Sequence, residues 1–294
     1  DTCLIQTRIQ NQIAQGVLEI INELKLKAYD TFRRSGLLRH ILIKEAFSTK
    51  QIMLVIVVSS DIFPSRKKFI SLLRQRFPQI STIVQNLNSR KTSVVLGNKE
   101  RVLFGKGFIE DELMGLRFRI TPSSFFQVNP IQTVFLYRLV KKYAFLTGKE
   151  LVLDAYSGVG TIGMVLSNDA KEVVCVENNP SATAAAIKNT KFNDIQNVRI
   201  IRDDATMFLK TVAKEKQTFD VLVMDPPRTG ATKEFLNAAR ASKPKRIVYV
   251  SCDPSTLVRD IKTLNHQYRI KKIAIVDMFS WTEHIECVVS LELA

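Results

Sequence analysis

Residues 153–163 read LDAYSGVGTIG, and this stretch indicates the fold more directly than any other part of the chain. It holds the pattern G-x-G-x-x-G between a β-prone run and an expected helix. Glycines in such a turn let backbone N–H groups approach a ligand, and an acid that ends the next strand can pair with ribose hydroxyls. Glu177 stands at that position. We therefore expect a nucleotide-type ligand at this turn.

Regular alternation of strands and helices surrounds this turn from about Lys149 onward. We expect strands at Glu150–Ala155, Glu172–Glu177, Val198–Ile201, Phe219–Met224, Arg246–Ser251, Tyr268–Asp277 and Ile285–Leu291. The last two are joined without room for a crossover helix, so the seventh strand must run antiparallel to its neighbour. The pattern predicts an α/β fold and resembles the Rossmann-like sheet of methyltransferases that use S-adenosylmethionine.

The glycine turn by itself fits two cofactor classes, a dinucleotide or S-adenosylmethionine. Asp154 lies just before the glycines. A carboxylate there would repel a pyrophosphate but suits a cationic, phosphate-free methyl donor. This interpretation favours S-adenosylmethionine over a dinucleotide oxidoreductase, which stays open as the alternative.

The net charge of +15 is concentrated in the first half of the chain. Residues 1–150 hold 24 Lys and Arg against 11 Asp and Glu, whereas residues 151–294 hold 19 against 17. A basic half of this kind favours a polyanion such as RNA as the partner. The sequence has no run of about 20 apolar residues, no signal-peptide pattern and no C-x-x-C pair, so we expect a cytoplasmic protein with reduced thiols, no metal site and no membrane association.

The charge and the pattern of expected strands and helices change along the chain. This change predicts two domains, a small basic α+β domain over residues 1–118 and a catalytic domain over residues 119–294. The first opens with an amphipathic helix and contains a basic helical stretch at Ser65–Phe77, our first candidate for contact with RNA phosphates. Its expected strands are Leu37–Ile43, Met53–Val58, Thr82–Gln85, Thr92–Leu96, Val102–Phe104 and Leu116–Ile120.

Two further turns are expected at the edge of the sheet where parallel strands end and ligands bind. The β-branched run before Cys252 stops at Asp253-Pro254, which is helix-start chemistry, so this cysteine should lie at the carboxyl end of a strand. Asp225-Pro226-Pro227-Arg228 follows the preceding strand as a rigid turn. Arg228 stands where enzymes that methylate exocyclic amines carry an aromatic residue, and this disfavours that chemistry.

Five separated motifs together resemble the RNA (uracil-5-)-methyltransferase family over about residues 37–294, and the form of the glycine turn is closest to the branch that acts on 23S ribosomal RNA. The motifs are Ser124–Asn129, Asp154–Gly160, Asp225–Arg228, Ser251–Thr256 and His284–Cys287. The resemblance implies Cys252 as the nucleophile and Glu286 as the general base. It implies that Gln127, Tyr156, Thr161, Glu177, Asp204 and Asp225 line the pocket for S-adenosylmethionine and the target base.

The resemblance also implies a mechanism and an RNA partner, and we expect the chain to be a monomer. A thiolate that adds to uracil C6 makes C5 nucleophilic, and a base must then remove the C5 proton before the cysteine leaves. The uracil must flip out of its stack, with Phe125 or Phe126 as a stacking surface, although we expect at least one of these rings in the core. We expect His284 to be an orienting or structural residue and not a proton carrier.

Family members of the ribosomal branch often carry a TRAM domain and a four-cysteine iron–sulfur site ahead of the catalytic part. Cys3 resembles only the last of those four ligands, so an iron–sulfur cluster is not expected in this chain, which we interpret as a fragment or processed form. A transfer-RNA uracil-5 methyltransferase, an RNA cytosine-5 methyltransferase and an RNA-binding protein with an inactive methyltransferase fold remain open as alternatives.

Overall fold

The computed structural model describes residues 2–294, which form two compact units. The first comprises residues 2–112 and 118–123, and the second comprises residues 113–117 and 124–294. No helix among residues 2–294 is long and apolar enough to cross a membrane.

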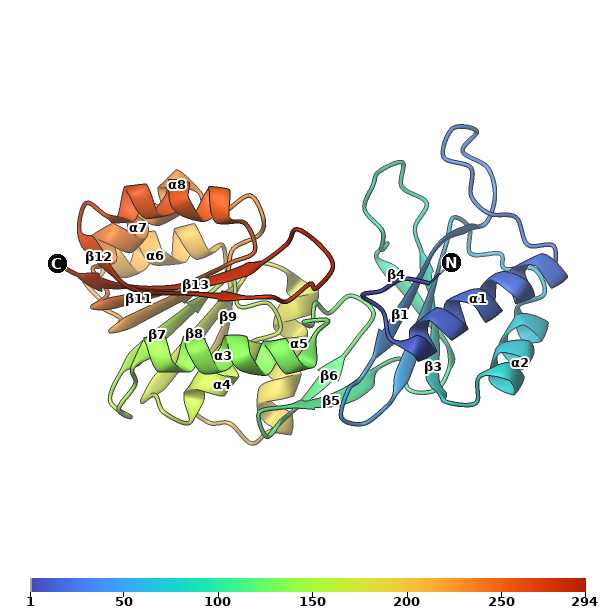
Figure 1. Ribbon diagram of the computed structural model, residues 1–294, viewed down its shortest axis with the longest axis horizontal. Helices are drawn as coiled ribbons and strands as arrows, with labels where there is room; N and C mark the ends of the chain where they lie inside the picture. Colours follow the sequence, from blue (N-terminus) through green and yellow to red (C-terminus); the bar gives the residue numbers. More distant parts are fainter. Residues whose placement is uncertain (1) are drawn as a thin grey trace. The chain divides into compact units, whose positions relative to one another are not determined.

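The first unit is built on a four-stranded sheet in the order β1-β2-β3-β4, with β2 and β3 parallel (Figure 1). Its elements are α1 Arg8–Glu23, β1 Leu38–Glu45, β2 Ile52–Val58, α2 Arg66–Arg76, β3 Ile80–Leu87 and β4 Lys99–Phe104. The apolar run of β2 is buried along its whole length because the strand is central. Apolar residues of α1 and α2 pack with β2 into one core. The expected helices and most of the expected strands are confirmed.

One expected strand, Thr92–Leu96, is instead an irregular loop. Asn88 Nδ2 donates to the carbonyls of Val94 and Val95 at 2.7 and 2.9 Å. A side chain therefore binds these carbonyl groups in place of the backbone of a neighbouring strand. The expected strand at residues 116–120 forms as β6 Leu116–Ile120 and pairs with β5 Ile109–Leu113, which the sequence pattern did not predict.

The second unit holds a seven-stranded sheet in the order β12-β13-β11-β10-β7-β8-β9. Its elements are α3 Pro130–Ala144, β7 Leu151–Ala155, α4 Thr161–Ser167, β8 Glu172–Glu177, α5 Pro180–Phe192, β9 Val198–Arg202, α6 Ala205–Lys214, β10 Val221–Met224, α7 Lys233–Ser242, β11 Arg246–Ser251, α8 Pro254–Leu264, β12 Tyr268–Val276 and β13 Glu286–Leu293. β13 is inserted between β11 and β12 and runs antiparallel to both. The predicted α/β sheet with an antiparallel last strand is confirmed.

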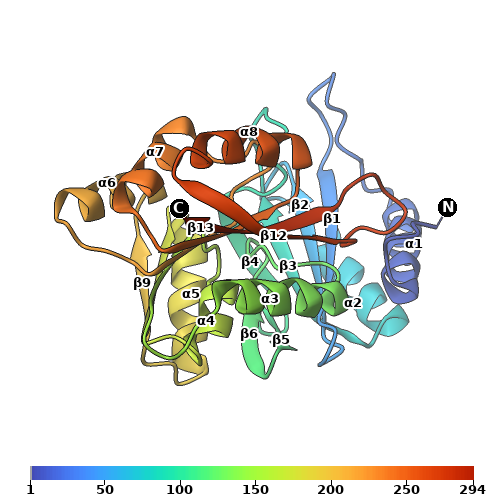
Figure 2. The same cartoon turned by 60° about the vertical axis from the view of Figure 1, so that its left-hand side comes forward.

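Helices cover both faces of this sheet, with α6, α7 and α8 on one face and α3, α4 and α5 on the other (Figures 1 and 2). The central strands β10 and β11 are buried almost throughout because both of their faces are covered. The order of strands along the chain reverses between β7 and β10. Ligands of open α/β sheets bind outside the carboxyl ends of the strands at such a point.

Candidate active site

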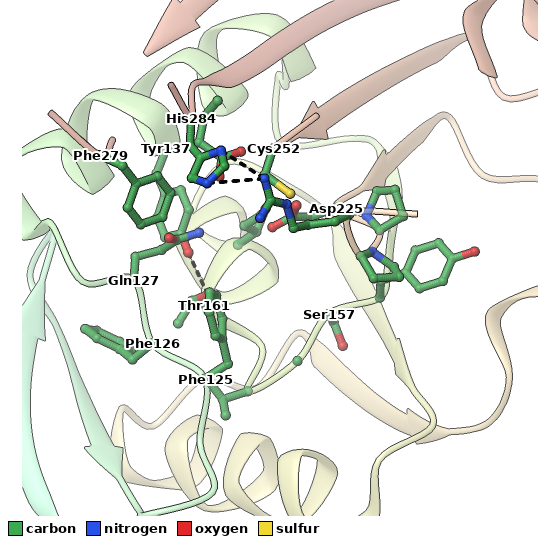
Figure 3. A pocket seen from close by; sticks show the side chains of 18 residues that line it. Phe125, Phe126, Gln127, Tyr137, Ser157, Thr161, Asp225, Cys252, Phe279 and His284 are labelled. Atoms are coloured by element: carbon green, nitrogen blue, oxygen red, sulfur yellow. Dashed lines mark hydrogen bonds between the residues drawn. The ribbon is translucent and has the colours of Figure 1, made fainter. Parts of the chain in front are cut away.

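A cavity of 620 Å³ lies at this edge of the sheet in the second unit (Figure 3). The loops after β7, β10 and β11 line it together with residues 125–127, Tyr137 and the segment that leads into β13. Figure 3 shows the side chains of Cys252, Asp225 and His284 gathered on one side of the cavity, with Gln127 and Thr161 facing them. Among the residues given a role by the sequence, this cavity brings together Gln127, Tyr156, Thr161, Asp225, Cys252 and Glu286.

The antiparallel insertion of β13 explains how Glu286 reaches Cys252. The register between β11 and β13 pairs Ser251 with Cys287. Cys252 follows Ser251 and Glu286 precedes Cys287, so the same register brings these two residues to the same edge of the sheet. The strand that returns last along the chain therefore delivers a carboxyl group to the cavity beside the cysteine.

Glu286 lies in an environment that disfavours its charge. Its side chain is only 4% exposed, and burial raises the pKa of this carboxyl from 4.5 to about 7, although the cation of Arg228 acts in the opposite direction. Burial, followed by the neighbouring Glu286 and Asp154, raises the pKa of Asp225 well above its usual range. A carboxyl group with a pKa near 7 is suited to take up a proton at neutral pH.

Cys252 is a free, partly buried cysteine at the carboxyl end of β11, immediately before α8. Asp253 caps that helix through hydrogen bonds from Ser255 N and Thr256 N at 2.9 and 3.0 Å. Burial, and then the carboxyl groups of Glu286 and Asp225, raise the pKa of the Cys252 thiol, whereas Arg228 lowers it. The thiol therefore ionises more readily when these two carboxyl groups are protonated.

Arg228 extends from the turn after β10 to the segment before β13. Its Nη2 atom lies 2.9 Å from Nδ1 of His284. Both residues line the cavity, and His284 is placed to orient the guanidinium group. On the opposite wall, the hydroxyl groups of Tyr137 and Thr161 are hydrogen-bonded at 2.9 Å (Figure 3). Sequence reasoning missed Tyr137, because a tyrosine in an amphipathic helix carries no signal of its own.

The glycine turn is held by the acid at the end of β8. Gly158 N donates to Glu177 Oε2 at 2.9 Å, and Asn179 N donates to Glu177 Oε1 at 2.7 Å. Gly158 adopts a φ of 56°, and no atom lies within 4 Å of the position that a Cβ would take. The backbone at Gly158 thus faces open space within the cavity wall.

Asp154 does not have the role that its position in the sequence suggested. Its side chain is 1% exposed, does not line the cavity, and accepts a hydrogen bond from Gly163 N at 2.8 Å. Burial raises its pKa to about 7. The carboxyl group points into the sheet–helix interior because it lies within β7 and not in the turn. Direct attraction between Asp154 and a cationic ligand is therefore not supported.

A second cavity of 310 Å³ shares Tyr156, Asp225 and Pro227 with the first. Glu177, Asp203 and Asp204 also line it, so the structure places every site residue named from the sequence in one of two adjoining cavities. Asp204 additionally caps α6 by accepting from Thr206 N and Met207 N at 2.9 and 3.1 Å. Both members of the Asp203–Asp204 pair line the cavity, so their placement does not choose between them.

These two cavities fit an S-adenosylmethionine-sized ligand with polar ends. Ser157 lines the larger one, is 8% exposed, and its hydroxyl oxygen is buried without a hydrogen-bond partner. The open space beside Gly158 leaves room for a ligand close to the backbone. The carboxylates that line the second cavity supply further polar contacts. The residues present therefore suit a ligand that offers hydroxyl and amino groups.

The two phenylalanines expected near the target base both line the larger cavity. Phe125 is 70% exposed and Phe126 is partly buried. The expectation that at least one of them belongs to the core is wrong, because the irregular segment before α3 runs along the cavity wall (Figure 3). Cys3 is exposed, and its backbone N–H donates to Asn11 Oδ1 at 2.9 Å.

Comparisons with known proteins identify the family of the chain. Residues 13–294 match the model of the tRNA (Uracil-5-)-methyltransferase family. An uncharacterized RNA methyltransferase of Caldanaerobacter subterraneus subsp. tengcongensis is 42% identical over 99% of this chain and 65% of its own length. One of Oceanobacillus iheyensis is 42% identical over 100% of this chain and 64% of its own length. The chain thus spans slightly less than two thirds of these relatives.

Among solved structures, the tRNA (uracil-54, C5)-methyltransferase of Pyrococcus abyssi in complex with S-adenosyl-L-homocysteine is similar to this chain, with a TM-score of 0.79 and 30% identity. The match covers 96% of this chain and 67% of that one. A tRNA m1G37 methyltransferase of M. jannaschii shares only the fold, at 15% identity and a TM-score of 0.54. From the family model, the sequence relatives and this structural match, we conclude that the chain belongs to the tRNA (uracil-5-)-methyltransferase family.

Proposed function

We propose that this chain is the catalytic part of an S-adenosylmethionine-dependent enzyme that methylates uracil at C5 in RNA. The observation that carries the proposal is the meeting of Cys252 and Glu286 in one cavity, at the ends of neighbouring antiparallel strands. This chemistry requires a thiol that attacks C6 and a proton acceptor that acts at C5, the two atoms of one ring double bond.

In the proposed reaction the Cys252 thiolate forms a bond to uracil C6, and the electrons of the C5–C6 double bond move toward the C4 oxygen. Arg228 stabilises the thiolate before the attack because its cation lowers the pKa of the thiol. The enolate electrons then form a bond from C5 to the methyl group that bound S-adenosylmethionine would supply, and the methyl–sulfur bond breaks to leave S-adenosylhomocysteine. Glu286 then removes the C5 proton, the double bond re-forms, and Cys252 leaves as a thiolate.

The remaining pocket residues are assigned to binding. We propose that Gln127, Tyr156, Thr161, Glu177, Asp204 and Asp225 hold S-adenosylmethionine and the target base, with Ser157 and the backbone at Gly158 as further contacts. A uracil must leave its stack to reach Cys252, and the exposed ring of Phe125 offers a surface for it. We assign RNA binding to the first domain, residues 1–118, and methyl transfer to residues 119–294.

For the RNA substrate we propose 23S ribosomal RNA as the first candidate. The form of the glycine turn favours 23S ribosomal RNA, whereas the Pyrococcus abyssi neighbour is named for transfer RNA, which makes transfer RNA the second candidate. Mapping 5-methyluridine by mass spectrometry in both RNA pools, from cells with and without the gene, separates them. Loss of 5-methyluridine from 23S RNA alone supports the first, and loss from transfer RNA alone supports the second.

The reaction itself is tested by tritium release from RNA labelled at C5 of uridine or of cytidine. The proposal predicts release from the uridine-labelled RNA only, and only when S-adenosylmethionine is present. Cytidine-dependent release would instead support the cytosine-5 alternative. A protein that binds S-adenosylmethionine and RNA, yet releases no tritium from either substrate, would contradict the proposed activity.

A further inference from the structure

The loop that precedes β1 presents an aromatic side chain to solvent. Phe32 is 97% exposed, more than any other large hydrophobic residue among residues 2–294. Single exposed hydrophobic residues are common on protein surfaces, so exposure alone does not indicate a site. The way in which this ring is held, and the charges around it, distinguish it from the others.

The loop is closed by a set of short-range hydrogen bonds. Asp30 and Ser35 exchange backbone hydrogen bonds of 2.7 and 3.3 Å, and Tyr29 N donates to Leu38 O at 2.8 Å. Asp30 Oδ1 accepts from the backbone N–H groups of Phe32 and Arg33 at 2.8 and 2.9 Å. The ring is therefore carried on a braced turn, which reduces the conformational entropy lost when it contacts a partner.

Positive charge surrounds this turn. The side chain of Arg33 is 85% exposed, and Arg34 follows it in an exposed, left-handed position at a φ of 54°. Arg39 stacks over the ring of Tyr29 at 4.6 Å, at the foot of the loop. Arg33 makes an ion pair with Asp30 at 3.9 Å, but both groups are exposed, so the pair is weak and a phosphate can replace the carboxylate.

Arg39 also connects this loop with a second basic loop, residues 88–98. Its Nη1 atom donates to Asn88 O and Arg90 O at 3.1 and 2.6 Å. The second loop contains Arg90 and Lys91, both exposed. In Figures 1 and 2 the two loops project from the same end of the first unit's sheet. The aromatic ring therefore belongs to an end of the unit that carries several cations.

The basic helix α2 is a weaker candidate than its composition suggests. Arg76 makes ion pairs with Glu19 and Glu23 of α1 at 3.1 and 2.9 Å, and Arg74 stacks over the ring of Phe104 at 4.1 Å. Two of its cations are thus engaged within the unit, next to two carboxylates that would repel a phosphate. Lys67 and Lys68 remain exposed on this helix.

We infer that residues 31–34, here called the Phe32 tip, form an RNA-contacting element in which Phe32 stacks on an unpaired base while Arg33 and Arg34 contact the flanking phosphates. Aromatic rings flanked by cations bind single-stranded RNA in this way. The inference rests on the proposed RNA substrate, and it adds a contact outside the catalytic cavity. A lipid surface is disfavoured because the tip offers one apolar ring and no continuous apolar face.

The test measures binding of a fluorescein-labelled single-stranded RNA by anisotropy, without S-adenosylmethionine, over a range of salt concentrations. Phe32→Ala should weaken binding by about 5- to 100-fold, with an unchanged salt dependence, and Phe32→Trp should restore it. The double change Arg33→Gln with Arg34→Gln should reduce the slope of log affinity against log salt by about 1.4. Ile62→Ala removes another exposed apolar side chain of the same unit and should have no effect.

Two outcomes would overturn the inference. One is unchanged affinity in Phe32→Ala together with a reduced salt slope in Lys67→Gln with Lys68→Gln, which would place the RNA on α2. The other is Phe32-dependent binding to phosphatidylglycerol vesicles without any effect on RNA. Because no turnover is needed, loss of RNA affinity in Phe32→Ala supports the inference even if tritium release fails, whereas normal tritium release with unchanged affinity contradicts the inference alone.

Discussion

Replacement of Glu286 with glutamine is expected to stabilise the protein at alkaline pH while it abolishes turnover. The buried carboxyl group has a pKa of about 7 in the folded chain, against an ordinary value of 4.5. Its protonated form fits the folded state better than its charged form, so the stability that it contributes is full below pH 4.5 and is lost as the pH rises through 7. Glutamine is uncharged at every pH and avoids that loss.

The size of the effect follows from the difference between the two pKa values. A change from 4.5 to about 7 corresponds to about 3 kcal/mol at pH values above 7. Because the side chain is only 4% exposed, solvent screening reduces this value little. The difference in unfolding free energy between Glu286→Gln and the unchanged protein should therefore grow by about 3 kcal/mol from pH 4.5 to pH 8.

Urea unfolding followed by circular dichroism at several pH values measures this difference. Subtraction of the two proteins at each pH cancels the titration of groups that they share. Glu283→Gln serves as the matched control, because its exposed carboxylate lies three residues earlier in the same segment. The free energy of unfolding of Glu286→Gln, plotted against pH, could instead run parallel to that of the unchanged protein within about 1 kcal/mol. That result would refute the claim that burial disfavours the Glu286 carboxylate.

Three further predictions concern the same cavity and its supports. The reaction rate at subsaturating RNA should fall at least tenfold per pH unit below pH 6, because Glu286 acts as a base with a pKa of about 7; a flat profile would exclude that role. Arg228→Gln should slow alkylation of Cys252 by iodoacetamide at pH 7.5, since Arg228 lowers the pKa of the thiol, and an unchanged rate counts against this. Gly163→Ala should lower the melting temperature because its Cβ would lie 2.3 Å from Cys175 Sγ; an unaltered melting curve would show that the helix can move aside.

The strand order of the second unit could be foreseen because it depends on local signals. Alternating β-rich and helical runs mark the parallel strands, and the missing crossover before the last strand requires an antiparallel partner. The carboxyl ends of those strands then place Asp225 and Cys252 at one edge. No local pattern states, however, that β13 inserts beside β11. The neighbourhood of Glu286 and Cys252 depends on that pairing, and the sequence motifs suggested it only through family resemblance.

The errors of the sequence reasoning have a common physical origin in tertiary contacts. Thr92–Leu96 has strand-forming residues, but the side chain of Asn88 binds the carbonyl groups of Val94 and Val95. Asp154 was interpreted as facing the ligand, yet its position within β7 turns it toward Gly163. The pKa values of Glu286 and Asp225 likewise arise from burial by segments far apart in the chain, which composition and spacing do not reveal.

The central claim is that Cys252 bonds to the uracil and needs Glu286 in order to leave it. The most direct measurement is denaturing gel electrophoresis of Glu286→Gln after incubation with RNA and S-adenosylmethionine, followed by mass spectrometry of the adduct. We predict a stable protein–RNA adduct through Cys252 that carries a methyl group at C5, and no adduct when Cys252→Ala is added. Normal release of methylated RNA by Glu286→Gln, or an adduct that persists without Cys252, would contradict the account.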